Sequence, residues 1–130
     1  MDEAALIREI ACVVRGQIGV LATGDPAAAD ARLAAVLNAP AVDPERLLDV
    51  LESDAGLHRV AAEALAAGSP ALASLAVVRS AGLPGHGDPD FLPTRFACPE
   101  ADFVWYRRSV GGAPPACPTH GAVLVADRQQ

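Results

Sequence analysis

The stretch DPERLLDVLESDAGLHRVAAEALAAG, residues 43–68, contains two helix beginnings and one helix end. Asp43 can cap a helix N-terminus by accepting a hydrogen bond from an unpaired backbone N–H, and Pro44 suits the first helical turn. A second helix begins after the Ser-Asp pair at 53–54, and Gly68 is typical of a helix end. Apolar residues at helical spacing form a stripe on the first of these helices: Leu47, Leu48, Val50 and Leu51. The stretch therefore predicts two short helices joined by a tight turn.

The same pattern of starts and stops continues on both sides of this stretch. Upstream, residues 3–21 are amphipathic, with Gly16 weakening the far end, and an Asp-Pro start predicts another helix over 25–37. Downstream, a Ser-Pro start and a Gly stop predict a fifth helix over 69–82. Because short connections favour antiparallel neighbours, we expect a mainly α fold with a bundle of about five helices in residues 1–82.

Composition and charge restrict the class of protein. The chain has 130 residues, 52% of them hydrophobic, which suffices for a core, and its net charge of −6 argues against a general nucleic-acid binder. The first residues are acidic, unlike a signal peptide, and no uncharged run reaches the length of a membrane span. We therefore expect a cytoplasmic protein whose cysteines are thiols or metal ligands.

The composition changes after the predicted bundle. Residues 83–93 are rich in Gly and Pro and predict a linker. In the tail, residues 94–130, the segments RFACP at 95–99, DFVWYRR at 102–108 and GAVLVAD at 121–127 have the short periodicity of strands. Every aromatic residue of the chain lies after position 90. The tail is therefore predicted to be a small β element.

Two Cys-Pro motifs in the tail suggest a metal site. CPTH places Cys117 and His120 where one tight turn can present both side chains, and thiolate and imidazole are the ligands that zinc prefers. CPEAD begins in the same way at Cys98, but Ala101 occupies the expected ligand position, and Asp102 follows one residue late. The predicted metal ligands are Cys98, Asp102, Cys117 and His120.

These motifs give the tail its resemblance to a known element. With its Cys-Pro start, aromatic strand DFVWY, Pro-rich loop and closing CPTHG, it resembles a degenerate zinc ribbon, which implies a structural zinc ion. The fourth ligand is left open between Asp102, His86 and water. Two other interpretations remain: a metal-free small sheet in which Cys98 and Cys117 are buried apolar residues, or a redox-active thiol pair.

The WYRR segment is a candidate partner-binding surface. An aromatic pair beside two arginines suits an acidic peptide or a stacked base, which points to Trp105, Tyr106, Arg107 and Arg108. The alternative is that Trp105 fills the small core of the tail. Strand alternation would turn Phe103 and either Trp105 or Tyr106 inward, and Val104 or Tyr106 outward.

Catalytic patterns are missing from the sequence. There is no Gly-x-Ser-x-Gly, phosphate-binding loop or His-Glu-x-x-His motif. His58 is expected on a helix surface, and Cys12 is expected in a helical core. We therefore predict that the chain is not an enzyme. A zinc-dependent hydrolase is the alternative if Asp102 leaves a coordination position open, with Glu100 as a nearby acid.

The short capped helices in a chain of this size carry a second resemblance. Residues 1–82 are similar to the small effector-associated or death-domain-like adaptor domains of bacterial conflict and signalling systems. This resemblance implies a protein partner, either a like helical domain or a larger effector such as a protease or NTPase. A nucleic-acid-associated regulator that uses the ribbon is the alternative.

Overall fold

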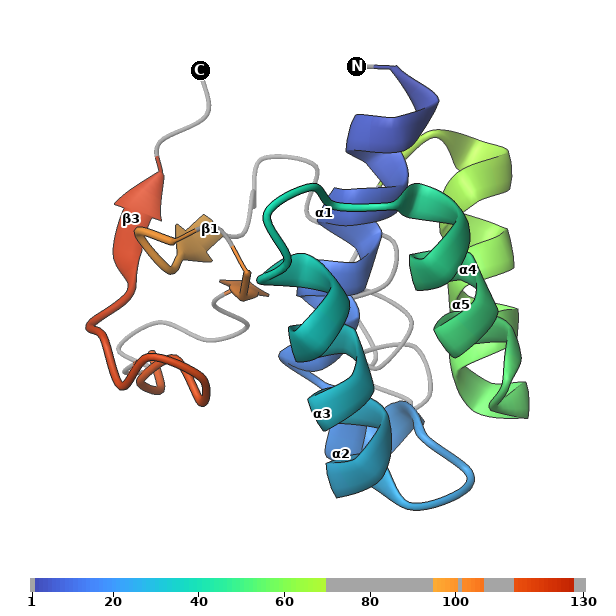
Figure 1. Cartoon of the computed structure of the whole chain (residues 1–130), viewed down its shortest axis with the longest axis horizontal. Helices are drawn as coiled ribbons and strands as arrows, with labels where there is room; N and C mark the ends of the chain where they lie inside the picture. Colours follow the sequence, from blue (N-terminus) through green and yellow to red (C-terminus); the bar gives the residue numbers. More distant parts are fainter. Residues whose placement is uncertain (1, 70–94, 101, 107–113, 128–130) are drawn as a thin grey trace, which may run out of the picture.

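A computed structural model describes residues 2–69, 95–100, 102–106 and 114–127 (Figure 1). The predicted linker and all but the first residue of the predicted fifth helix lie outside these ranges. The described residues form a helical bundle and a small antiparallel sheet. Their helices are α1 (Glu3–Arg15), α2 (Ile18–Leu21), α3 (Pro26–Leu37), α4 (Pro44–Glu52) and α5 (Ala55–Ala67).

Acidic side chains start four of the five helices. The carboxylates of Asp2, Asp25, Asp43 and Asp54 accept hydrogen bonds from the first backbone N–H groups of α1, α3, α4 and α5. Gly68 ends α5 in the left-handed conformation, with φ of +66°. The starts and the stop predicted between residues 43 and 68 are thus confirmed.

The prediction of one helix over residues 3–21 is wrong in one respect, because the segment forms two helices. Gly16 and Gln17 separate α1 from α2, and Gln17 leaves the helical conformation with φ of −132°. At Gly16 the carbonyl oxygen of Val104 approaches closely, and an added Cβ would lie only 2.7 Å from it. The glycine that was expected to weaken the helix therefore also admits a strand of the tail.

α1 is the central element of the molecule. It packs against α4 and α5 on one side and against the sheet on the other (Figure 1). Its buried face includes Ile10, which is fully buried, and Cys12, which lies in the helical core as predicted. His58 is exposed on α5, also as predicted. No helix in the described ranges is both long enough and apolar enough to cross a membrane.

The tail forms a three-stranded sheet. Its strands are β1 (Arg95–Ala97), β2 (Val104–Tyr106) and β3 (Val125–Asp127), in the order β2-β1-β3 with antiparallel pairing. All three predicted strand segments are present, although the last is confined to the end of its predicted range. Phe96 in the central strand pairs with Trp105 on one side and Ala126 on the other.

Side chains of β1 and β2 are buried on both faces of the sheet, whereas Val125 of β3 is exposed, and this corrects one expectation. Phe103 and Trp105 lie with a small cluster of the tail, and Val104 is on the opposite face as alternation requires. Val104 does not face solvent, however, because it is 1% exposed and belongs to the core of the helical bundle. A bidentate ion pair between Glu9 of α1 and Arg95 of β1, at 2.6 and 2.8 Å, also joins the two parts.

Candidate metal centre

The first donor loop directly follows β1. The N–H of Cys98 donates a hydrogen bond to the carbonyl of Phe103 at 3.0 Å. The N–H of Glu100 donates to the Sγ of Cys98 at 3.4 Å, so the backbone wraps around the sulfur atom. Asp102 comes just before the residue that closes the loop. The loop therefore presents a thiol at its start and a carboxylate near its end.

The second donor loop has the same length. The N–H of Cys117 donates to the carbonyl of Ala122 at 3.0 Å, and the N–H of Gly121 donates to the carbonyl of Cys117 at 2.7 Å. Gly121 has φ of +64°, a conformation that glycine adopts without steric cost, and it allows the chain to turn after His120. Both loops thus close from a cysteine to the fifth residue after it, but their second donors differ by one position.

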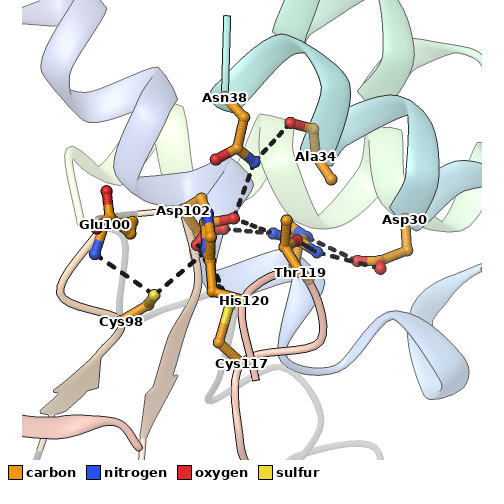
Figure 2. Close-up of polar contacts among 10 residues, drawn as sticks. Asp30, Ala34, Asn38, Cys98, Glu100, Asp102, Cys117, Thr119 and His120 are labelled. Carbon is orange, nitrogen blue, oxygen red and sulfur yellow. Dashed lines mark hydrogen bonds and ion pairs between the residues drawn. The ribbon is translucent and has the colours of Figure 1, made fainter. Parts of the chain in front are cut away.

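Four donor atoms from the two loops converge at one point (Figure 2). Oδ1 of Asp102 is 3.3 Å from the Sγ of Cys117 and 3.3 Å from Nδ1 of His120. Nδ1 of His120 is 3.6 Å from the sulfur atoms of both Cys98 and Cys117. Metal–ligand bonds of about 2.0–2.3 Å at tetrahedral angles separate neighbouring donors by about 3.3–3.8 Å. The four residues could therefore hold a metal ion.

Three of the four donor residues are buried. Cys98 and Cys117 are buried, and the side chain of Asp102 has no solvent exposure. The side chain of His120 is 31% exposed and faces the solvent. An ion at this centre would thus lie just beneath the surface, behind the imidazole.

The two oxygens of the Asp102 carboxylate have different surroundings. Oδ1 faces Cys117 and His120, as described above. Oδ2 accepts hydrogen bonds from Nδ2 of Asn38 at 2.9 Å and from Nη1 of Arg15 at 3.2 Å. Arg15 Nη1 also donates to the backbone carbonyl of Asp102 at 2.7 Å. Side chains of the helical bundle therefore hold one oxygen and leave the other directed at the remaining donors.

Arg15, at the end of α1, connects the bundle to both donor loops. Its Nε and Nη2 donate to the two oxygens of Asp30 at 2.7 and 3.2 Å, and Nη2 also donates to Oγ1 of Thr119 at 2.7 Å. With the two bonds to Asp102, these contacts match the five N–H donors of a guanidinium group. Its guanidinium carbon also lies 5.7 Å from the ring centroid of Phe103. This buried charge is therefore fully paired by hydrogen bonds.

Burial and hydrogen bonding act in opposite directions on the acid of this centre. Burial tends to raise the pKa of Asp102, but hydrogen bonds from Asn38 and Cys117, together with the charge of Arg15, lower it to about 2. For the Cys98 thiol, burial dominates and raises the pKa to about 11. Asp102 is therefore ionised at neutral pH, whereas Cys98 keeps its proton until a cation displaces it.

The structure brings together the four ligands predicted from the Cys-Pro motifs. Asp102, one residue later than a ribbon would place it, still reaches the other donors. His86, the other proposed protein ligand, lies outside the described residues. No disulfide joins the three cysteines, all of which fall within the described ranges.

The candidate partner-binding segment is described only in part. Trp105 is half-buried, and its ring lies 5.7 Å from that of Phe96 at an angle of 55°. Tyr106 is the last residue of β2, and its side chain is outside the described part of the chain, as are Arg107 and Arg108. The packing of Trp105 fits its interpretation as a core residue of the tail, and its partner-binding role stays a prediction.

Three residues around the centre lie outside the sequence motifs: Arg15, Asp30 and Asn38. Thr119 lies within CPTH, but its bond to Arg15 was not predicted. Arg15 and Asn38 are 87 and 64 residues away from the aspartate that they contact. Arg15 looks like an ordinary polar residue at the end of an amphipathic helix. Its role depends on tertiary packing, which local spacing does not encode.

Comparisons with protein-family models, with curated proteins and with solved structures find no match for this chain. The function must therefore be argued from the geometry of the centre.

Proposed function

We propose that the chain is a small interaction module whose C-terminal tail is a zinc-ribbon-like element stabilised by a structural zinc ion. The observation that carries this proposal is the convergence of the donor atoms of Cys98, Asp102, Cys117 and His120, which all lie within 4.8 Å of one another and include four separations of 3.3–3.6 Å. Two thiolates, an imidazole and a carboxylate suit zinc better than magnesium or calcium, which prefer oxygen ligands. Four protein ligands are typical of a structural site.

The size of the sheet supports a structural role for the ion. Each described strand has three residues, and a sheet this small buries little apolar surface. A zinc ion can supply the missing stability, because metal binding to a site that forms only on folding contributes to the folding free energy. The ion would fasten the two donor loops together at the edge of α1.

The test is the metal content of the purified protein, measured by mass spectrometry after expression with added zinc. We expect one zinc ion per chain in the wild type and its loss in Cys117→Ser. Cys12→Ser is the matched control, because Cys12 is also a buried cysteine but lies in the helical core. It should retain zinc. A wild-type protein that binds no metal would contradict the proposal.

We further propose that the module acts as an adaptor or regulator that binds a protein partner in a bacterial signalling or defence system. The support is the resemblance of the capped helices to adaptor domains, and the net charge of −6 favours a partner with a basic face. Proximity labelling in the native cell, with wild type and Cys117→Ser, tests this role. A basic protein labelled by both variants would place the contact on the bundle. If the labelled proteins bind nucleic acid and the labelling is lost after nuclease treatment, the alternative of a nucleic-acid-associated regulator would be favoured.

A further inference from the structure

We propose that Arg15 and Asn38 are positioning residues for the metal centre: they hold Oδ2 of Asp102 so that Oδ1 alone is offered to the ion. This inference rests on the proposed zinc site and assigns to the helical bundle a direct part in metal binding. It would make the affinity of the tail for zinc depend on α1 and α3.

The geometry of Asn38 supports this role. Asn38 follows α3 directly, and its Nδ2 donates to the carbonyl of Ala34 at 2.8 Å and to Oδ2 of Asp102 at 2.9 Å. Both N–H groups of the amide are therefore used, one to anchor the side chain on its own helix and one to orient the carboxylate (Figure 2). The side chain spans the gap between the bundle and the donor loop.

Arg15 acts on both donor loops at once. It contacts Asp102 in the first loop and Thr119, the neighbour of His120, in the second. Asp30 holds the other side of the guanidinium group in a bidentate pair. The guanidinium group is thus held from three sides, and a residue that orients a metal ligand needs this kind of support.

The position of Asp102 explains why this support is needed. In the second loop the donor lies three residues after the cysteine, whereas Asp102 lies four residues after Cys98. A carboxylate can bind a metal through one oxygen or two, and a free one can also turn away from the ion. The hydrogen bonds from Arg15 and Asn38 to Oδ2 prevent the carboxylate from binding through both oxygens and from turning away from the ion. Two thiolates and one carboxylate around a divalent ion leave one excess negative charge, and the buried Arg15 cation, which also pairs with Asp30, lies directly beside it.

The experiment measures the zinc affinity of the full chain by competition with a chromogenic chelator, and the absorption spectrum of the cobalt-substituted protein. Asn38→Ala is the first variant, because Asn38 is exposed and its loss should leave the fold intact. Arg15→Lys is the second, since it keeps the charge but loses the forked geometry. We expect zinc affinity to fall by about 10- to 100-fold, and the cobalt spectrum to change, because the carboxylate is no longer fixed.

Glu9→Gln is the matched control. It weakens the ion pair with Arg95, which also joins α1 to the sheet but does not contact the donor residues. It should lower stability while leaving the cobalt spectrum unchanged. If Asn38→Ala and Arg15→Lys bind zinc as tightly as the wild type with the wild-type spectrum, the positioning role is wrong and the zinc site stands. If the wild type itself binds no zinc, the proposed function fails, and this inference fails with it.

Discussion

The helical bundle and the C-terminal sheet build their cores in different ways. Among the described residues, the cluster of the bundle has eighteen buried members, and one of them, Val104, comes from the sheet. The cluster of the sheet has five buried members, and two of these are the candidate ligands Cys98 and Cys117. The bundle can therefore fold on apolar burial, whereas the sheet has too little apolar surface to do so.

Because of this difference, individual polar contacts should matter more for the stability of the tail than for that of the bundle. In the bundle, each apolar contact is one of many, so the loss of one lowers the stability of the bundle by only a small fraction. In the tail, we expect stability to depend on a few contacts with strict geometry: the four donors of the proposed zinc site, the Arg15 network and the close approach of β2 to α1. Changes that affect these contacts should act on the tail and leave the bundle largely intact.

Removal of the proposed zinc ion should have the largest effect. We expect a strong zinc chelator to abolish amide hydrogen-exchange protection in β1, β2 and β3 while protection in α4 and α5 persists. The reason is that a structural zinc site contributes apparent binding energy on the order of 10 kcal/mol, more than the small sheet can replace. Hydrogen exchange with mass spectrometry measures both regions in one sample, so the bundle is the internal control. Unchanged protection of the strands after confirmed metal loss would show that packing alone holds the sheet.

Gly16→Ala should have an intermediate effect on the contact between the two regions. The added Cβ would lie 2.7 Å from the Val104 carbonyl oxygen, so α1 and β2 must move apart. We expect a loss of about 1–3 kcal/mol in the free energy of unfolding, as for other overpacked sites, measured by urea titration of the zinc-loaded protein.

Gly19→Ala is the control for this substitution. Gly19 lies in α2, and an added Cβ there would meet no atom within 4 Å. Because alanine favours helix over glycine, this variant should be neutral or slightly more stable. Equal losses in the two variants would mean that the close approach at Gly16 is not the cause.

Asp54→Ala should have the smallest effect, and it should be confined to the bundle. The Asp54 carboxylate caps α5 through the N–H groups of Gly56 and Leu57, and it also accepts hydrogen bonds from the N–H groups of Thr23 and Gly24. We expect the free energy of unfolding to fall by about 1–2 kcal/mol near neutral pH, with zinc content unchanged. Asp43→Ala is the control, since Asp43 caps only α4, and it should cost less.

The effect of Asp54→Ala should also depend on pH. Hydrogen bonds from the backbone, that of Thr23 foremost, hold the pKa of Asp54 well below its usual range. A depressed pKa contributes stability that is complete above the unfolded value of about 4 and is lost as the pH falls through the folded value. The difference between wild type and variant should therefore be largest near neutral pH and shrink in acid. A constant difference across this range would contradict the assignment.

The helices could be predicted because their signals are local. An aspartate before a proline, or a glycine after an apolar stripe, acts within one helical turn, and Asp25, Asp43 and Gly68 are found as expected. The division of the first helix could not be predicted, because its signal is a long-range contact. Gly16 is compatible with a continuous helix, and only the approach of Val104, 88 positions later, explains why a glycine is required there.

The sequence by itself indicated Cys98, Cys117 and His120 as ligands with Asp102 as a candidate for the fourth, together with the capped helices and the three strand segments, because thiol spacing, capping and alternation are properties of short stretches. The tertiary structure alone decided that Asp102 reaches the other donors, that Val104 is buried against α1, and that Arg15 and Asn38 hold the carboxylate. These three outcomes depend on how the sheet lies against the bundle. That arrangement results from the packing of residues far apart in the chain, and no local pattern records it.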